Sequence, residues 1–315
     1  MSKIERMGRR LAVLVMLGSG LAACGTSREG TVIDADKVLT AQTQGDFQKI
    51  VAEGDELWKE RKDRAKLEQA IAKWEESTTV ATPDMSEDQR RKALGDVYQK
   101  VSHGYYFLAD AHIRTAGADP DATDEQMKEV FNKGVLAAEK GLGVYSKEFA
   151  QEIRQEKPWP EAIKVLDDGA VPLLYWYATN IGKWALLEGF TEILSRKEDI
   201  KAIMDMVEAK DPTYFHGAPM RYFGAYYTKL PFPGGDLPKS EEYFKKAIAA
   251  DPNYLATRVL FAENYATKMD NKELYREHLE FVLKFDLSQA PDLLPENHFE
   301  QIKAKAMLDK IDDTF

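Results

Sequence analysis

The side chains that most often carry out chemistry are scarce in this 315-residue sequence. Five histidines occur, but the chain has no H-E-x-x-H motif and no second cysteine to complete a zinc cluster. A G-x-S-x-G nucleophile turn, a phosphate-binding loop and a G-x-G-x-x-G motif are also missing. Adjacent carboxylates such as Asp167 and Asp168 are typical of the solvated surface of an acidic protein. We therefore expect neither an enzyme nor a cofactor or metal site.

The lone cysteine, Cys24, lies in a sequence context that is typical of a covalently modified residue. A basic start, an apolar stretch over residues 11–17 and small residues before a cleavage point predict that residues 1–23 are a secretory signal peptide. The signal ends in Leu-Ala-Ala-Cys, which resembles the bacterial lipobox, whose cysteine is acylated and becomes the mature N-terminus. The alternative is an ordinary buried cysteine. Gly25, in place of an aspartate after the cysteine, favours the outer membrane over the inner membrane.

The composition describes an acidic chain with enough apolar residues to fold. The formal net charge is -10, and cleavage after residue 23 removes four basic residues and one acidic residue, which leaves -13. Because no basic stripe is present, we expect no nucleic-acid partner. The hydrophobic fraction of 44% is sufficient for a core, and no second apolar run is long enough to span a bilayer. We expect a lipidated flexible tether over residues 24–45 and a folded domain over residues 46–315.

The elements that would position a site in this domain are helices that recur at a regular spacing. Asp-Pro-x-Tyr sequences at residues 211–214 and 251–254 each indicate a helix end. Before the second of these, Ser240, Phe244 and Ala247 have the small–aromatic–small spacing of the second helix of a tetratricopeptide repeat. The same pattern, with larger or different residues, recurs at Ile200, Met204 and Val207, and again at Leu274, His278 and Phe281.

Weaker copies of the pattern lie upstream. They comprise Ala70, Trp74 and Ser77, and later Leu108, Ala109 and His112 with Gly134, Ala138 and Gly141. No run of alternating apolar residues indicates a strand. We therefore predict an all-α fold, a degenerate tetratricopeptide-like solenoid of about four to five helix pairs. Insertions are expected around residues 118–130, 143–172 and 231–236. The alternative is an irregular α-helical bundle, which also spaces its apolar residues four and seven apart.

Two segments have the composition of a ligand cavity or an interface. Residues 173–184 carry four aromatic side chains on more than one helix face, although packing within a helical core would also explain them. Residues 217–236 run from a helix, in which Gly224 stands where the repeat needs a small residue, into a Pro-Phe-Pro-Gly-Gly loop. Arg221 is the fixed positive charge beside these aromatics and would either bind a carboxylate or form a salt bridge. The candidate ligand or pore residues are Tyr175, Trp176, Asn180, Trp184, Arg221, Tyr222, Tyr226 and Phe232.

Together these features resemble the TRAP transporter TatT component family. The resemblance covers the mature chain and rests on Cys24, on residues 175–184, 211–221, 230–236 and 246–258, and on Pro-Glu-Asn at 295–297. It implies a periplasmic lipoprotein of cryptic tetratricopeptide repeats that forms a homotrimer with a central pore. The implied partner is the periplasmic solute-binding protein of a tripartite ATP-independent transporter, and the implied ligand is a hydrophobic or amphipathic organic acid.

The leading hypothesis is a lipid-anchored helical-repeat protein that assists the uptake of organic acids on the periplasmic side of a bacterial membrane. The alternative is a lipoprotein scaffold for envelope assembly, because helical repeats commonly bind other proteins. An envelope hydrolase is disfavoured, since the sequence offers no paired nucleophile and base.

Overall fold

The computed structural model describes residues 38–39, 43–117, 119–230 and 234–315, and this part of the chain is helical without a β-strand. The predicted signal peptide, Cys24 and Phe232 lie outside the described residues. An isolated bridge joins Thr43 to Val80, with the Thr43 amide donating to the Thr79 carbonyl at 2.8 Å. The end of the predicted tether is therefore attached to the helical body.

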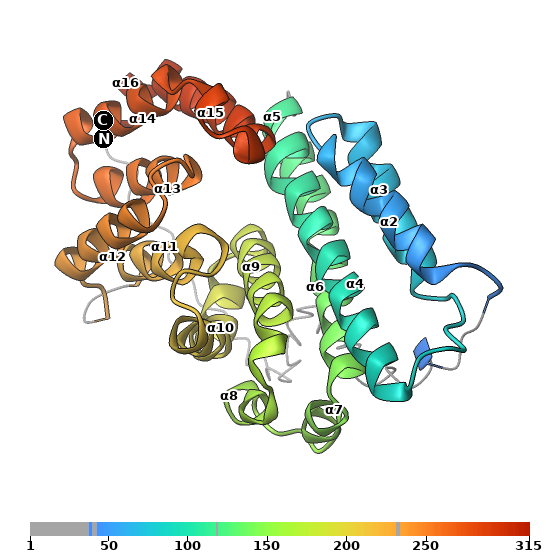
Figure 1. Ribbon diagram of the computed structural model, residues 1–315. Coiled ribbons are helices and arrows are strands. Elements are labelled where there is room, and N and C mark those ends of the chain that lie inside the picture. The colour runs from blue at the N-terminus through green and yellow to red at the C-terminus, as the bar shows by residue number, and fades with distance from the viewer. Residues whose placement is uncertain (1–37, 40–42, 118, 231–233) are drawn as a thin grey trace, which may run out of the picture.

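The helices follow one another as hairpins, as predicted for a helical repeat (Figure 1). The first half consists of α2 (Phe47–Lys59), α3 (Arg64–Ser77), α4 (Glu87–Phe107), the π-helix η2 (Leu108–Ile113), α5 (Arg114–Ala116), α6 (Pro120–Tyr145), α7 (Lys147–Arg154), α8 (Trp159–Ala162), η3 (Ile163–Val165) and η4 (Asp168–Ala170). The second half consists of α9 (Val171–Glu188), α10 (Phe190–Lys210), α11 (Tyr214–Lys229), α12 (Leu237–Ala250), α13 (Ala256–Leu260), the π-helix η5 (Phe261–Ala266), α14 (Lys272–Lys284), η6 (Leu287–Gln289), η7 (Pro291–Leu293), α15 (Leu294–Asp309) and α16 (Ile311–Thr314). The pairs that pack together are α2 with α3, α4 with α6, α9 with α10, α11 with α12, and η5 with α14.

The residues that define the repeat pattern in the sequence are the buried residues of their helices. Helices α10 and α12 end one residue before Asp211 and Asp251, as predicted. Ser240, Phe244 and Ala247 are the buried residues of α12, and the Ser240 hydroxyl donates to the Gly224 carbonyl of α11 at 2.6 Å. A small residue on each helix thus lets the two backbones approach closely.

The upstream copies of the pattern are buried as well. Ala70, Trp74 and Ser77 lie on the buried face of α3. The later copy spans two helices, because its first half forms the π-helix η2 and its second half lies on α6. The α6 residues in this copy, Gly134, Ala138 and Gly141, are all buried.

One prediction of detail was wrong. Phe281 is 40% exposed, because the buried face of α14 consists of Tyr275, His278, Leu279 and Val282 instead.

The segment around residues 119–130, where an insertion is expected, forms the start of α6. Asp119 caps this helix by accepting from the amides of Asp121 and Ala122. A proline in the first turn suits a helix start, and Pro120 is the first residue of α6.

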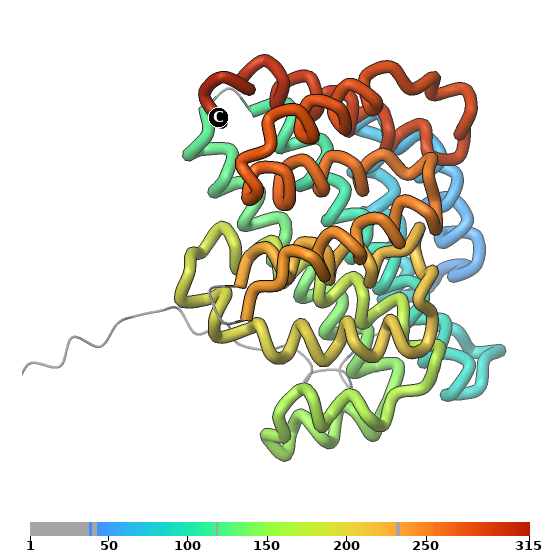
Figure 2. The backbone as a smooth tube through the Cα atoms, turned by 90° about the vertical axis from the view of Figure 1, so that its left-hand side faces the viewer, coloured from blue at the N-terminus to red at the C-terminus, as the bar shows by residue number. Residues whose placement is uncertain are grey.

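Helix α15, the last long helix, returns to the N-terminal half of the molecule (Figures 1 and 2). Figure 2 shows the chain from α10 onward rising in successive layers to the C-terminal helices. The Arg61 guanidinium, just after α2, donates to both carboxylate oxygens of Glu296 on α15, each at 2.7 Å. The Phe299 ring packs edge-on against Phe107 and His112, with centroid separations of 5.7 and 4.5 Å. These contacts close the helical repeat into a strongly curved body.

Among the described helices, none combines the length and apolar character that crossing a bilayer requires.

We expect Gly224→Ala to destabilise the protein by about 1–3 kcal/mol through overpacking. A Cβ atom at this position would lie 2.7 Å from the Phe244 ring, which is fully buried and stacked on Phe261 at a centroid distance of 5.0 Å. The matched control is Gly182→Ala on α9, where the nearest atom outside its own helix backbone is 3.8 Å away. The control should gain about 0.5–1 kcal/mol from helix propensity. Denaturant unfolding of both variants tests this packing, and equal stabilities would contradict it.

Candidate functional site

A cavity of about 290 Å³ lies among α9, α10, α11 and the α13–η5 segment. Three small residues on one face of α9 leave this space open, namely Ala178, Gly182 and Ala185, which are four and three residues apart. Ala218 and Ala225 do the same on α11. Residues at these spacings share one helix face, so larger side chains there would fill the cavity.

The cavity is apolar where α9 meets α10. Gly189 links the two helices in a backbone conformation, φ 119°, that side-chain-bearing residues rarely adopt. Leu186, Phe190 and Leu194 line the cavity on either side of this glycine and are exposed, Phe190 to 64%. An apolar lip that remains in contact with water is typical of a ligand-binding or protein-binding surface.

The charged residues of the cavity wall have the opposite sign to the protein as a whole. The formal net charge of the chain is -10. The cationic lining residues are Arg114, Lys183, Lys197, Arg221 and Lys229, whereas Glu263 is the acidic lining residue. Positive charge in a partly enclosed, low-dielectric space attracts anions more strongly than the same charge on an open surface.

Arg221 is buried and is held by the backbone. Its guanidinium donates to the carbonyls of Phe215 and His216, the former at 3.0 Å, and lies 4.4 Å from the centroid of the Tyr254 ring. A carboxylate ligand or a salt bridge is expected for Arg221 from the sequence, but these carbonyls are its hydrogen-bond partners among the described residues. Phe215, His216 and Gly217 all have positive φ angles, so Arg221 stabilises a strained turn in the wall.

Three of the predicted tyrosines line the cavity, Tyr175 from α9 and Tyr222 and Tyr226 from α11. Burial raises the pKa of Tyr222 well above its usual range, and the neighbouring Tyr226 adds to the effect. Burial also raises the pKa of Tyr226. Both hydroxyls therefore stay protonated at physiological pH and can donate a hydrogen bond to a ligand.

The structure places Trp176, Asn180 and Trp184 in the core, away from the cavity. The Trp176 ring stacks on His103 at a centroid distance of 3.8 Å. The Asn180 amide donates to the Ser102 hydroxyl at 3.1 Å and to the Trp176 carbonyl at 2.9 Å, which joins α9 to α4. Trp184 is 7% exposed and belongs to the hydrophobic core. These residues occupy other faces of α9 than the one that lines the cavity.

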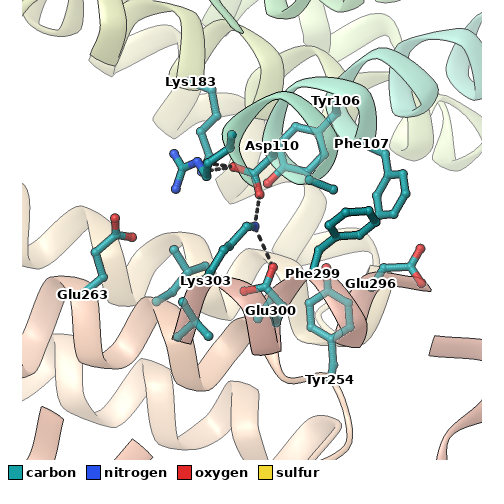
Figure 3. Close-up of a pocket in the computed structure, with 15 residues that line it drawn as sticks. Tyr106, Phe107, Asp110, Lys183, Tyr254, Glu263, Glu296, Phe299, Glu300 and Lys303 are labelled. Carbon is teal, nitrogen blue, oxygen red and sulfur yellow. Dashed lines mark hydrogen bonds and ion pairs between the residues drawn. The ribbon is translucent and has the colours of Figure 1, made fainter. Parts of the chain in front are cut away.

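A buried charge cluster beside the cavity was not predicted (Figure 3). Asp110, on the π-helix η2, accepts from Lys183 of α9 at 2.9 Å and from Lys303 of α15 at 2.6 Å. Lys303 also donates to Glu300 at 2.8 Å, and the Arg114 Nε atom lies 3.6 Å from Asp110. We name Asp110, Arg114, Lys183, Glu300 and Lys303 the buried charge cluster. It lines a smaller cavity of about 50 Å³ that shares Tyr106, Lys183 and Tyr254 with the larger one.

Burial alone disfavours the charged form of Asp110. The positive charges of Lys183, Lys303 and Arg114 outweigh that effect and hold the pKa of Asp110 well below its usual range. Burial likewise opposes the charge on Lys303, but Asp110 and Glu300 raise its pKa. Asp110 and Lys303 are therefore both charged at neutral pH.

One signal in the sequence points to this cluster. Asp110 interrupts the apolar Leu-Ala-x-Ala run at residues 108–111, where the repeat pattern expects burial, and a buried carboxylate needs cationic partners. The partners lie 73 and 193 residues away, so the sequence could not identify them. Within the described ranges, no three metal-ligating side chains come together.

A sequence model of the TRAP transporter T-component family matches residues 90–315. The chain belongs to this family. The match extends from α4 to the C-terminus and includes both cavities and the buried charge cluster. It confirms the resemblance to the TatT component family and associates the protein with TRAP transport. No curated protein matches the chain. This T-component family describes part of a transporter and is not a class of enzymes.

We expect Asp110→Asn to destabilise this T-component protein by about 3–5 kcal/mol at pH 7, because Lys183 loses its carboxylate partner and Lys303 keeps only Glu300. The folded pKa of Asp110 is lowered, so its contribution is present above the unfolded pKa of about 4 and is lost as the pH falls below that value. The wild-type free energy of unfolding should therefore fall more steeply below about pH 4 than that of the variant.

Chemical denaturation between pH 2 and pH 7 measures both effects. The control is Asp313→Asn, which changes an exposed carboxylate on α16 and should leave stability nearly unchanged. If Asp110→Asn matched this control at pH 7, the cluster would contribute no stability.

Proposed function

We propose that this T-component protein is a lipid-anchored periplasmic protein that partners the solute-binding protein of a TRAP transporter and assists the uptake of amphipathic organic acids. The observation that carries the proposal is the cavity of about 290 Å³, whose wall combines an apolar lip with clustered cations in a protein of net charge -10. Ligand sites are usually concave and mostly apolar, with a few polar groups that orient the ligand.

The charge distribution supports an organic acid over a neutral apolar ligand. Removing cations from water is costly, so a cavity intended for a neutral molecule would be cheaper to build from uncharged side chains. Membership of a transporter family supports a ligand that is passed on and not chemically changed. In this proposal, the cavity holds the acid temporarily during its passage to the transporter.

Anchoring through Cys24 would strengthen a weak interaction with the solute-binding protein. Two proteins kept at the same membrane meet at a raised effective concentration, so a modest intrinsic affinity is sufficient. The proposal also includes a homotrimer with a central pore and attachment to the outer membrane, both of which follow from the resemblance and from Gly25 after the cysteine.

Crosslinking in the native envelope, followed by capture of the tagged protein and mass spectrometry, tests the proposed partnership. We expect near-stoichiometric recovery of a periplasmic solute-binding protein, together with TRAP membrane subunits. Capture with a tagged, unrelated lipoprotein of the same membrane controls for proximity. Recovery of envelope-assembly factors without a solute-binding protein would contradict the proposal and favour the scaffold alternative.

Lipid anchoring has a separate test in Cys24→Ala. A lipobox without its cysteine cannot be acylated, so the variant should leave the membrane fraction. Metabolic labelling with a clickable fatty acid should mark the wild type and leave the variant unmarked. A processed variant that stays firmly attached to membranes would rule out Cys24 as the anchor.

A further inference from the structure

We propose that Arg114, Lys183 and Lys229 form the head-group subsite of the large cavity and bind the single carboxylate of a ligand whose alkyl chain extends toward the lip at Leu186 and Phe190. This inference rests on the proposed ligand class and adds its orientation and charge. It selects an amphipathic monocarboxylate over a neutral apolar molecule and over a dicarboxylate.

The three cations converge on one end of the cavity. Lys183 and Arg114 both approach the same Asp110 oxygen, at 2.9 and 3.6 Å. Lys229, in the last turn of α11, lines the large cavity as well and is exposed to water. Partial removal from water lowers the pKa of Lys229, Glu263 opposes this effect, and the charges of Lys183 and Arg114 lower the pKa further. All three cations therefore line the same cavity, and two of them lie beside Asp110.

Protein carboxylates leave this end of the cavity with an excess of positive charge. Asp110 is shared among Lys183, Lys303 and Arg114, while Glu300 pairs with Lys303. Within the described ranges, Lys229 has no ion pair within 4.0 Å, and the buried Arg114 Nε atom has no hydrogen-bond partner.

Four carboxylates line this end, and one of them, Glu296, is paired with Arg61. The three that remain are Asp110, Glu300 and Glu263. They oppose four cations, namely Arg114, Lys183, Lys229 and Lys303. A ligand with one negative charge would make the number of negative charges at this end equal to the number of positive charges.

The helix geometry gives the ligand its direction. Leu186 and Leu187 follow Lys183 by one turn on the same face of α9, about 4.5–6 Å along the helix axis. Beyond Gly189, Phe190 continues the apolar lip. A carboxylate at Lys183 therefore places an alkyl chain along leucine side chains. The other cations in the wall have their own partners, since Lys197 lies 3.4 Å from Glu198 and Arg221 is bonded to backbone carbonyls.

Calorimetric titration of the full-length protein in a detergent without alkyl carboxylates tests the orientation. The probes are octanoate, octan-1-ol and octanedioate, which share a chain length but differ in charge. We expect octanoate to bind at least tenfold more tightly than either of the others, because a charged hydrogen bond is lost in octanol and a second charge meets the apolar lip in octanedioate. Hexanoate should bind more weakly than octanoate, by about fourfold for each methylene removed.

Variants of Lys229 separate charge from packing. Lys229→Gln should weaken octanoate binding by about tenfold and leave octanol binding unchanged, whereas Lys229→Arg should retain octanoate binding. The control is Lys245→Gln on α12, an exposed lysine paired with Glu241, which should bind octanoate like the wild type. Thermal melts of each variant check that the fold is intact.

Equal affinity for octanoate and octanol, or unchanged octanoate binding in Lys229→Gln, would overturn the assignment of the head-group subsite. Tighter binding of octanedioate would overturn the single-charge preference. Failure of all three probes to bind would overturn the whole inference. The partnership with a solute-binding protein would be unaffected by any of these results, because envelope capture tests it independently.

Discussion

The arrangement of this protein depends on one buried carboxylate. Asp110 projects from a π-helix and holds lysines from two other helices, α9 and α15, at 2.9 and 2.6 Å. Without those lysines the carboxylate would be a buried charge with few partners. Without the carboxylate, Lys183 would lose its ion-pair partner and Lys303 would keep only Glu300. The three helices are therefore fixed relative to one another, and the last long helix of the chain is attached to the first half of the repeat. Arg61 and Glu296 fix the start of the same helix through a bidentate ion pair.

The site lies where the second half of the repeat curves back on itself. The α13–η5 segment lines the large cavity together with α9 and α11, and α15 lines the smaller cavity beside it. Small residues on α9 and α11, among them Gly182 and Ala225, keep a space of about 290 Å³ between the helices. Lys183 contributes both to the ion pairs that close the repeat and to the wall of the cavity. An anion in the cavity would therefore act on the same charges that hold α15 in place.

The sequence predicted those parts of the fold that depend on local spacing. Helix ends at Asp211 and Asp251 and the buried positions of α12 follow from neighbours within a few turns, and the structure confirms them. Phe281 was assigned to the wrong face because a single helix pattern does not specify which of two adjacent faces meets α15. The sequence placed Trp176 and Asn180 in the site because their composition suits a cavity, whereas their contacts with His103 and Ser102 on α4 decide that they are core. The charge cluster joins residues as far as 193 positions apart, and local sequence patterns do not show which distant residues pair.

The most direct test of this account is a crystal structure of the protein with 8-bromooctanoate, in which anomalous scattering locates the bromine. The account predicts one bromine site in the large cavity near Leu186 and Phe190, with the carboxylate within hydrogen-bond distance of Lys183 or Lys229. Bromine at the cationic end, or binding confined to the outer surface of the molecule, would contradict it.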